Sequence, residues 1–169
     1  SMKILQIIAH PADLSFTRAL AKSFADGAIS KGHSISLIDV YDRWTEADVK
    51  DQILAADHLC FAWPSWWEMP PAPLVELLQT VFVKGFAFDL KNGRMQPLLD
   101  LTTTCLVSMG QKKDYNSYNM GDAMRYCGLY PHFYIFNGVG PDLPQVKKEQ
   151  YLNMAYHSGS KLRDKLCLR

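Results

Sequence analysis

Short apolar runs alternate along the chain with longer segments in which apolar residues recur at helical spacing. The runs occupy residues 3–9, 34–40, 57–63, 101–109 and 132–139. Each run is too short for a helix, and near-continuous apolar character is typical of parallel strands that are buried on both faces. The apolar spacing between these runs predicts five helices. One ends at Gly32, one begins at Thr45, one spans residues 74–83, one ends near Gly128 and one spans residues 146–168.

Strands that are separated by helices predict one architecture. Five such strands form a parallel sheet with right-handed crossovers and with helices on both faces. A chain of 169 residues fits one domain of this kind. We therefore expect a single doubly wound α/β domain over residues 1–169, with a five-stranded parallel sheet. Ser1 precedes Met2, and we interpret it as a remnant of tag removal without functional meaning.

The composition narrows the possible functions. Hydrophobic residues make up 48% of the chain, which is enough for a core that needs no disulfide or metal. The 18 lysines and arginines nearly balance the 17 acidic residues, so no strong field attracts nucleic acid, and we predict no nucleic-acid partner. No apolar stretch approaches the roughly 20 residues of a membrane span. With no signal segment before the first strand, we expect a cytoplasmic protein.

The cysteines and histidines do not form a metal-binding pattern. The four cysteines, Cys60, Cys105, Cys127 and Cys167, are widely separated and have no histidine at ligand spacing. The five histidines also show no close pairing with cysteine or carboxylate. We predict reduced cysteines that pack as small apolar residues, and no metal site.

Candidate chemistry lies in the loops that follow the strands, because an open parallel sheet binds ligands at the carboxyl ends of its strands. The first such loop leads into a helix whose first-turn N–H groups can hold an anion. Ser15 and Thr17 add hydroxyl donors, and His10 and Arg18 can add charge. Neither G-x-G-x-x-G nor G-x-x-x-x-G-K-[ST] is present, which favours a monophosphate over a dinucleotide or triphosphate. The alternative is that Ser15 or Asp13 only caps the helix.

The second loop, residues 63–72, contains three of the four tryptophans together with three prolines. Indole faces stack on planar heterocycles, and prolines reduce the entropy that a loop loses when it binds a ligand. We expect Trp66 and Trp67 to contact a planar ligand and Trp63 to pack in the interior. The alternative is that Trp66 and Trp67 pack on the next helix or on a partner subunit.

Three groups of residues carry a resemblance to a known family. They are His10-Pro11 with Ser15 and Thr17, Pro64-x-x-Trp67 with Pro71-Ala72, and the segment from Val81 to Phe88. With them, the chain resembles the flavodoxin-like NAD(P)H:quinone oxidoreductases, a family that includes mammalian quinone reductases, bacterial modulator of drug activity proteins and ancillary subunits of potassium-efflux systems. These groups span about half of the chain, and the predicted fold matches over the rest.

The resemblance implies a flavodoxin-like doubly wound sandwich that forms a homodimer with one flavin per subunit. It implies ping-pong, two-electron hydride transfer from NAD(P)H through the flavin to a small-molecule acceptor such as a quinone, azo or nitro compound. By the same resemblance, His10, Ser15, Phe16 and Thr17 hold the flavin phosphate, and Pro64, Ser65, Trp66 and Trp67 line the ring. The short chain has no evident segment to cover an adenosine, so FMN is favoured over FAD.

The third loop departs from the family pattern. Where relatives carry Thr-Thr-Gly-Gly against the flavin ring, this chain has Ser108, Met109, Gly110 and Gln111. A side chain at 111 disfavours positive φ and can alter flavin affinity. The segment has no histidine, which leaves Gln111, Tyr115 and Tyr118 as the candidate catalytic contacts to the ring or the acceptor. The alternative is that these three are solvated loop residues.

We expect the segment from Gly85 to Phe88 to form an exposed loop that carries two aromatic side chains. Such an apolar patch is unfavourable on a monomer, and a two-fold dimer would bury it. Two other functions stay open at this point: a flavin-binding regulatory subunit of a transport system, and a non-enzymatic FMN electron carrier.

Overall fold

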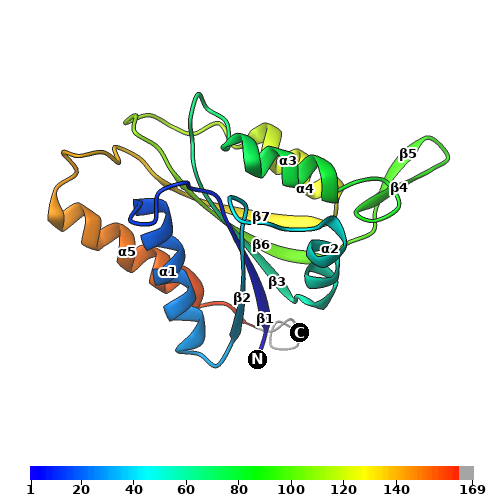
Figure 1. The fold of residues 1–169 in the computed structure, drawn as a ribbon, viewed down its shortest axis with the longest axis horizontal. Helices are drawn as coiled ribbons and strands as arrows, with labels where there is room; N and C mark the ends of the chain where they lie inside the picture. Colours follow the sequence, from blue (N-terminus) through cyan, green and yellow to red (C-terminus); the bar gives the residue numbers. More distant parts are fainter. Residues whose placement is uncertain (164–169) are drawn as a thin grey trace.

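The computed structural model describes residues 1–163, apart from the side chains of residues 118 and 119 (Figure 1). Its elements follow one another as β1 (Lys3–Ile8), α1 (Phe16–Ile29), β2 (Ser34–Asp39), α2 (Glu46–Ala55), β3 (His58–Pro64), α3 (Ala72–Val81), β4 (Phe88–Lys91), β5 (Arg94–Pro97), β6 (Leu101–Ser108), α4 (Tyr118–Tyr126), β7 (Leu129–Phe136) and α5 (Gln145–Ser160). The predicted alternation of strands and helices is confirmed.

The central sheet has five parallel strands in the order β2-β1-β3-β6-β7. The chain winds from β1 outward to β2 and then returns across β1 to β3 before it continues to the opposite edge. The strand order therefore reverses between β1 and β3, and a crevice opens outside the carboxyl ends of these two strands. The predicted fold class is confirmed.

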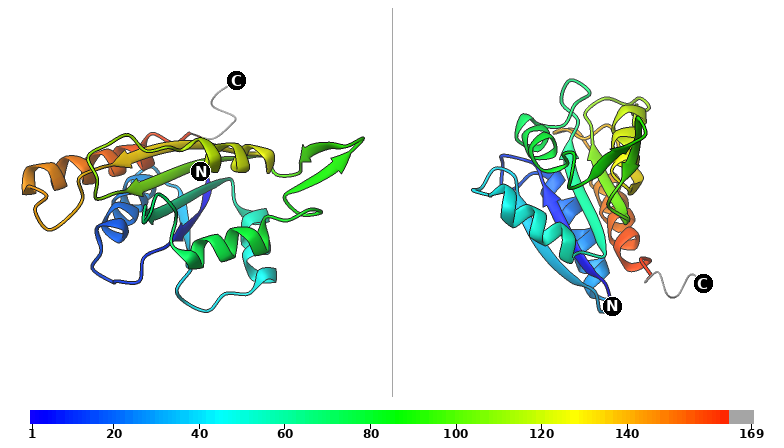
Figure 2. Two further views of the ribbon diagram at one scale, coloured as in Figure 1. Left: turned by 90° about the horizontal axis from the view of Figure 1, so that it is seen from above. Right: turned by 90° about the vertical axis from the view of Figure 1, so that its right-hand side faces the viewer.

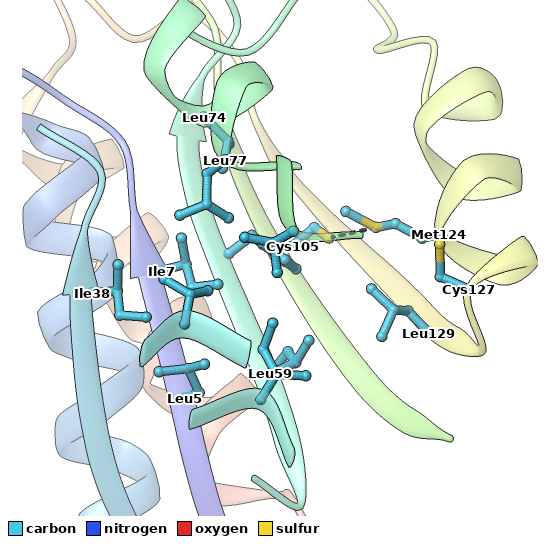
Figure 3. Packing of buried hydrophobic residues seen from close by; sticks show 14 of the residues in the cluster. Leu5, Ile7, Ile38, Leu59, Leu74, Leu77, Cys105, Met124, Cys127 and Leu129 are labelled. Atoms are coloured by element: carbon cyan, nitrogen blue, oxygen red, sulfur yellow. Dashed lines mark hydrogen bonds between the residues drawn. The ribbon is translucent and has the colours of Figure 1, made fainter. Parts of the chain in front are cut away.

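Helices cover both faces of the sheet (Figures 1 and 2). On one face, α1 and α5 enclose a cluster that includes Ile4, Phe24 and Tyr151. On the other, α2, α3 and α4 close over a second cluster of buried residues. Figure 3 shows part of it, with side chains from five elements of the sheet and from α3 and α4: Leu5, Ile7, Ile38, Leu59, Leu74, Leu77, Cys105, Met124 and Leu129.

The cysteines pack as predicted within the described part of the chain. Cys60, Cys105 and Cys127 are free and buried, and Cys167 lies outside the described residues. Burial raises the pKa of the Cys60 thiol to about 12, so this side chain is an uncharged packing residue near neutral pH. Among the described residues, no helix has both the length and the apolar character that crossing a membrane requires.

The boundaries of β7, α3 and α5 differ from the sequence-based expectation. β7 begins and ends three residues earlier than predicted, because its pairing with β6 runs from Leu129 to Phe136 and leaves residues 137–144 as a loop. α3 begins at Ala72, since proline is tolerated in the first turn of a helix. α5 ends at Ser160 instead of continuing through residues 161–163; the predicted end at 168 lies outside the described residues.

A two-stranded antiparallel hairpin, β4–β5, was not predicted. It projects from the body between α3 and β6 (Figures 1 and 2). Its turn residues Asn92 and Gly93 have φ of 53° and 74°, and Asn-Gly is a strong short-range hairpin signal. The expected exposed aromatic patch is also wrong. Phe86 and Phe88 are half-buried against the α2–α3 side of the core, and the Lys50 ammonium lies 5.2 Å from the Phe86 ring centroid.

Candidate functional site

The loops that follow β1, β3 and β6 lie at the same edge of the sheet (Figure 1). Two adjoining cavities are lined by residues of these three loops. The smaller, of about 160 Å³, is lined by His10, Phe16, Thr17, Pro64, Ser65, Trp66, Ser108, Met109, Gly110 and Val139. The larger, of about 750 Å³, is lined by Ser65, Trp66, Trp67, Glu68, Met109, Gly110, Gln111 and Lys113. Four residues line both, so the two cavities form one continuous site.

The first loop is organised around the start of α1. Ser15 is the N-cap, and its hydroxyl accepts a hydrogen bond from the Arg18 backbone N–H at 3.2 Å. The Arg18 guanidinium bonds the carbonyls of His10 and Ala12 and forms an ion pair with Asp39 at 2.7 Å. Arg18 therefore holds the loop against β2, and Ser15 acts as the helix cap that the sequence allowed as an alternative.

His10 lines the smaller cavity in a defined protonation state. Its Nδ1 accepts a hydrogen bond from the Ala12 backbone N–H at 3.0 Å, which leaves the proton of the neutral ring on Nε2. Partial burial, and then the Arg18 charge, lower the pKa of His10 below its usual value. The ring meets Trp66 edge-on, with centroids 5.4 Å apart. His10 is thus a neutral N–H donor that also contacts the tryptophan loop.

Thr17 and Ser108 join the first loop to the end of β6. Their hydroxyl oxygens lie 3.0 Å apart, and both residues are buried. The contact spans 91 positions in the sequence. It brings the helix N-terminus and the third loop to the same side of the smaller cavity, and this long-range pairing has no signature in the local sequence.

The tryptophan loop closes in a tight turn with unfavourable backbone angles. The backbone N–H of Trp66 donates to the carbonyl of Met69 at 2.9 Å, and the reverse bond is 3.0 Å. Between them, Trp67 and Glu68 have φ of 53° and 61°. Such angles are unfavourable for residues other than glycine and persist only when surrounding contacts hold them, often at binding sites.

The exposure of the tryptophans agrees with the division made from the sequence. Trp63 is fully buried in the core, as predicted, and its Nε1 has no hydrogen-bond partner among the described residues. Trp66 and Trp67 line the larger cavity and are 43% and 93% exposed. Their aromatic surface is therefore available to a ligand or a second subunit.

The third loop is held by the segment that follows β7. Met109 donates from its backbone N–H to the Phe136 carbonyl and accepts from Val139, both at 2.9 Å, and the Gln111 carbonyl accepts from Gly138 at 3.1 Å. Gln111 does not adopt positive φ. The replacement of a second glycine by Gln111 is therefore compatible with the loop, and it adds an amide to the wall of the larger cavity.

The two candidate tyrosines are placed differently. Tyr115 is half-buried with its ring 6.3 Å from that of Phe133, and burial raises its pKa. Among the described residues that line the two cavities, Tyr115 is not present. Tyr118 begins α4, and its side chain lies outside the described residues.

Three lining residues were missed from the sequence. Glu68 and Lys113 form an ion pair on the wall of the larger cavity, and Val139 lines the smaller one. The pair could not be anticipated, because it joins residues 45 positions apart. Val139 was missed because the fifth strand was predicted to extend through it. The glycines at 138 and 140 indicate instead that it lies in the loop after β7. This fourth loop lines a further cavity of about 600 Å³ beside the site, together with Lys112 and Lys147.

Comparisons with known proteins agree with this geometry. Residues 2–152 match the family described as having a flavodoxin-like fold. The chain is 26% identical, over 162 residues and 80% of each chain, to a protein of Haemophilus influenzae called an uncharacterized NAD(P)H oxidoreductase. An NAD(P)H:quinone oxidoreductase from Methanothermobacter marburgensis superposes with a TM-score of 0.85 at 22% identity, covering 96% of this chain and all of that one. An FMN-dependent NADH-azoreductase from Bacillus anthracis, in complex with FMN, has a TM-score of 0.83 at 14% identity, covering 95% of this chain and 99% of that one.

Proposed function

The chain belongs to the family of proteins with the flavodoxin-like fold, and on that premise we propose that it is a flavin-dependent NAD(P)H oxidoreductase that reduces quinones, azo compounds or nitro compounds. The observation that carries the proposal is the continuous double cavity at the reversal of strand order, with a small polar compartment beside a large aromatic one. That shape matches a phosphate joined to a flat ring system, and this position in the fold is a usual ligand site.

The residues present fit FMN. The smaller cavity lies at the N-terminus of α1, where first-turn N–H groups attract an anion, and His10 adds a neutral N–H donor. Thr17 and Ser108 contribute hydroxyls at its wall. In the larger cavity, Trp66 and Trp67 provide aromatic surface for a planar ring. A single phosphate and a ring account for the two compartments, which favours FMN over FAD.

When bound, FMN would accept a hydride from NAD(P)H and return two electrons to the acceptor, so that NAD(P)H, a proton and a quinone give NAD(P)⁺ and a hydroquinone. The chain's own residues bind and orient the reactants: the aromatic walls exclude water, and Gln111 adds an amide to the wall of the larger cavity. NAD(P)H and the acceptor would both bind in the larger cavity, one after the other, and such alternating occupancy gives ping-pong kinetics. Initial-rate lines that intersect when NADPH and quinone are both varied would contradict this shared compartment.

The names of the similar proteins support the same chemistry. One relative is called an NAD(P)H oxidoreductase, one structure is an NAD(P)H:quinone oxidoreductase, and another is an azoreductase with FMN.

We further propose a homodimer, on a surface different from the one first expected. The exposed Trp67 and Met69 continue into a groove of about 590 Å³ along α3, whose walls include Val75. A two-fold partner would cover this apolar surface next to the larger cavity. Light scattering at micromolar concentration is expected to give twice the mass of one chain, and a monomeric mass would contradict the proposal.

The decisive experiment is a visible spectrum of protein that has been loaded with FMN and desalted, followed by anaerobic NADPH and then menadione. We expect retained yellow absorbance that bleaches with NADPH and returns with menadione over many turnovers. Protein that retains no flavin would overturn the proposal, and reduction without turnover would favour a regulatory flavin site.

Two glycine variants show whether the double cavity itself binds the flavin. Gly110 lines both compartments, and a Cβ built there meets only the Val139 carbonyl oxygen, at 3.6 Å. Gly110→Leu should therefore fold while its side chain takes up ligand space, and the desalted protein should lose its yellow colour. Gly140→Leu is the matched control, because it has no neighbour within 4 Å and lines only the adjacent cavity. Equal flavin retention in both variants would place the flavin elsewhere.

A further inference from the structure

The wall of the larger cavity carries one positive and one negative side chain. Of the eight residues that line it, Lys113 and Glu68 are the charged ones, and they pair with each other. Lys113 belongs to the loop after β6, and Glu68 belongs to the tight turn after β3. The pair therefore joins the two loops from which the whole lining of this cavity is drawn.

The exposure of the pair argues against a main role in stability. The side chains of Lys113 and Glu68 are 48% and 62% exposed, and exposed ion pairs contribute little to folding. Glu68 nevertheless occupies a backbone conformation that is unfavourable for a residue with a side chain, at φ 61°. A glycine would adopt this turn more easily, so the carboxylate is placed at the cavity against a local preference.

Other nearby cations are directed elsewhere. Arg18 is bound to Asp39 and to the carbonyls of its own loop. Lys112 lies beside Gly138, with its Cγ 3.3 Å from a Cβ built on that glycine, and lines the neighbouring cavity. Within the described residues, Lys113 is the cation on the wall of the larger cavity.

Charge matters in this cavity because of the proposed reaction. A hydride carries two electrons and one proton. Its transfer from NAD(P)H to an uncharged ring would therefore give the ring one net negative charge until a second proton arrives. A cation at the wall stabilises that charge, and a carboxylate beside it opposes the effect. Such preorganised charges favour the reduced state without reorganisation during the reaction.

We propose that Lys113 supplies the positive charge that stabilises reduced flavin in this site, and that Glu68 is a positioning residue that holds Lys113 at the cavity wall and limits its effect. The inference rests on the proposed function. It assigns the stabilisation of the added negative charge to a lysine, in a segment of the third loop that has no histidine.

The test compares the midpoint potential of bound FMN in Lys113→Gln and Glu68→Gln, measured by equilibration with a reference dye. Lys113→Gln should weaken binding of reduced FMN about tenfold relative to oxidised FMN, which lowers the potential by about 30 mV for a two-electron couple. In Glu68→Gln, the side-chain amide oxygen can still accept a hydrogen bond from the Lys113 ammonium and so keep it at the wall, while the opposing charge is gone; the potential should therefore shift upward. Lys112→Gln is the matched control and should leave the potential unchanged.

Potential shifts of opposite sign in the two variants distinguish charge stabilisation from a purely structural contact between the two loops. If the pair only holds the loops together, both substitutions break it, and both potentials move in the same direction; that result would overturn the inference. A Lys113→Gln potential equal to that of Lys112→Gln would also overturn it. If the wild-type protein binds no FMN, this inference and the proposed function both fail. If the wild-type protein binds FMN and turns over, but the variants have the wild-type potential, this inference alone fails.

Discussion

The two ends of the central sheet are built in opposite ways. At the amino-terminal end, both ring nitrogens of His58 lie within 2.8 Å of threonine hydroxyls, and Gly128 fits against the Leu99 carbonyl. At the carboxyl-terminal end, Trp67 and Glu68 hold unfavourable φ angles beside open cavities. The comparison indicates that stability is concentrated at the first end, whereas the second end keeps strain and space for a ligand.

The largest effect is expected from Gly128→Ala at the amino-terminal end. Gly128 has φ of 80°, and a Cβ there would lie 1.7 Å from the Leu99 carbonyl oxygen, so the backbone must shift. We expect a loss of about 3–5 kcal/mol in the free energy of unfolding, measured with urea. Gly93→Ala is the control: φ is 74° but nothing lies within 4 Å, so about 1–2 kcal/mol is expected. Equal losses would show that the contact with Leu99 is unimportant.

Acid should weaken the same end through His58. Burial, with a smaller contribution from the His33 charge, lowers the pKa of His58 from 6.5 to about 4. The folded protein therefore resists protonation, so the stabilisation is complete above pH 6.5 and is lost as the pH falls toward 4, by about 3 kcal/mol in total.

A variant isolates this histidine from the other titrating groups. In His58→Asn, the free energy of unfolding should change less between pH 7 and pH 4.5 than in the wild type. His157→Gln, at an exposed position, should keep the wild-type slope. A wild-type slope in His58→Asn would contradict the assignment.

At the carboxyl-terminal end, the strained turn can be exchanged for a relaxed one. The double substitution Trp67→Asn with Glu68→Gly gives the Asn-Gly pair that already forms the β4–β5 turn at similar angles. Stability should be kept or improved, while the loss of aromatic stacking should weaken FMN binding by about tenfold or more. Fluorescence titration with FMN and a urea unfolding curve measure the two effects. A tight FMN complex in this variant would remove Trp67 from the proposed site.

The smallest effect concerns His10. Burial, and then the Arg18 charge, lower the pKa of His10, so the ring loses its proton more readily in the free folded protein than in an unfolded chain. A bound phosphate would favour the protonated ring, so FMN affinity should rise a few-fold as the pH falls from 7.5 to 5.5. His10→Gln should abolish that rise, and His157→Gln should preserve it.

Much of the candidate site was recognisable before the fold was seen. The loops after β1, β3 and β6 carry residues that line the two cavities, because parallel strands place their carboxyl ends at one edge. Trp63 and Trp66 were separated correctly into core and surface. The hairpin was not predicted although Asn92-Gly93 signalled it, because it interrupts the alternation of parallel strands and helices.

Local patterns could not decide the contacts made across the fold. The sequence offered Arg18 as a ligand charge, but its pairing with Asp39 depends on β2 lying beside β1. Phe86 was expected at the surface and is half-buried, because α2 packs beside α3 and brings Lys50 over its ring.

The sequence by itself determined the class of fold and the edge of the sheet that carries the site. Apolar periodicity, helix caps and strand length act over a few residues, so they can be read without knowing the neighbours. Only the tertiary structure decided the backbone strain at Trp67, the contact of Thr17 with Ser108 and the pairing of Glu68 with Lys113. These features depend on groups 45 to 91 positions apart or on contacts that outweigh a local preference, and such energies exist only once the chain has folded.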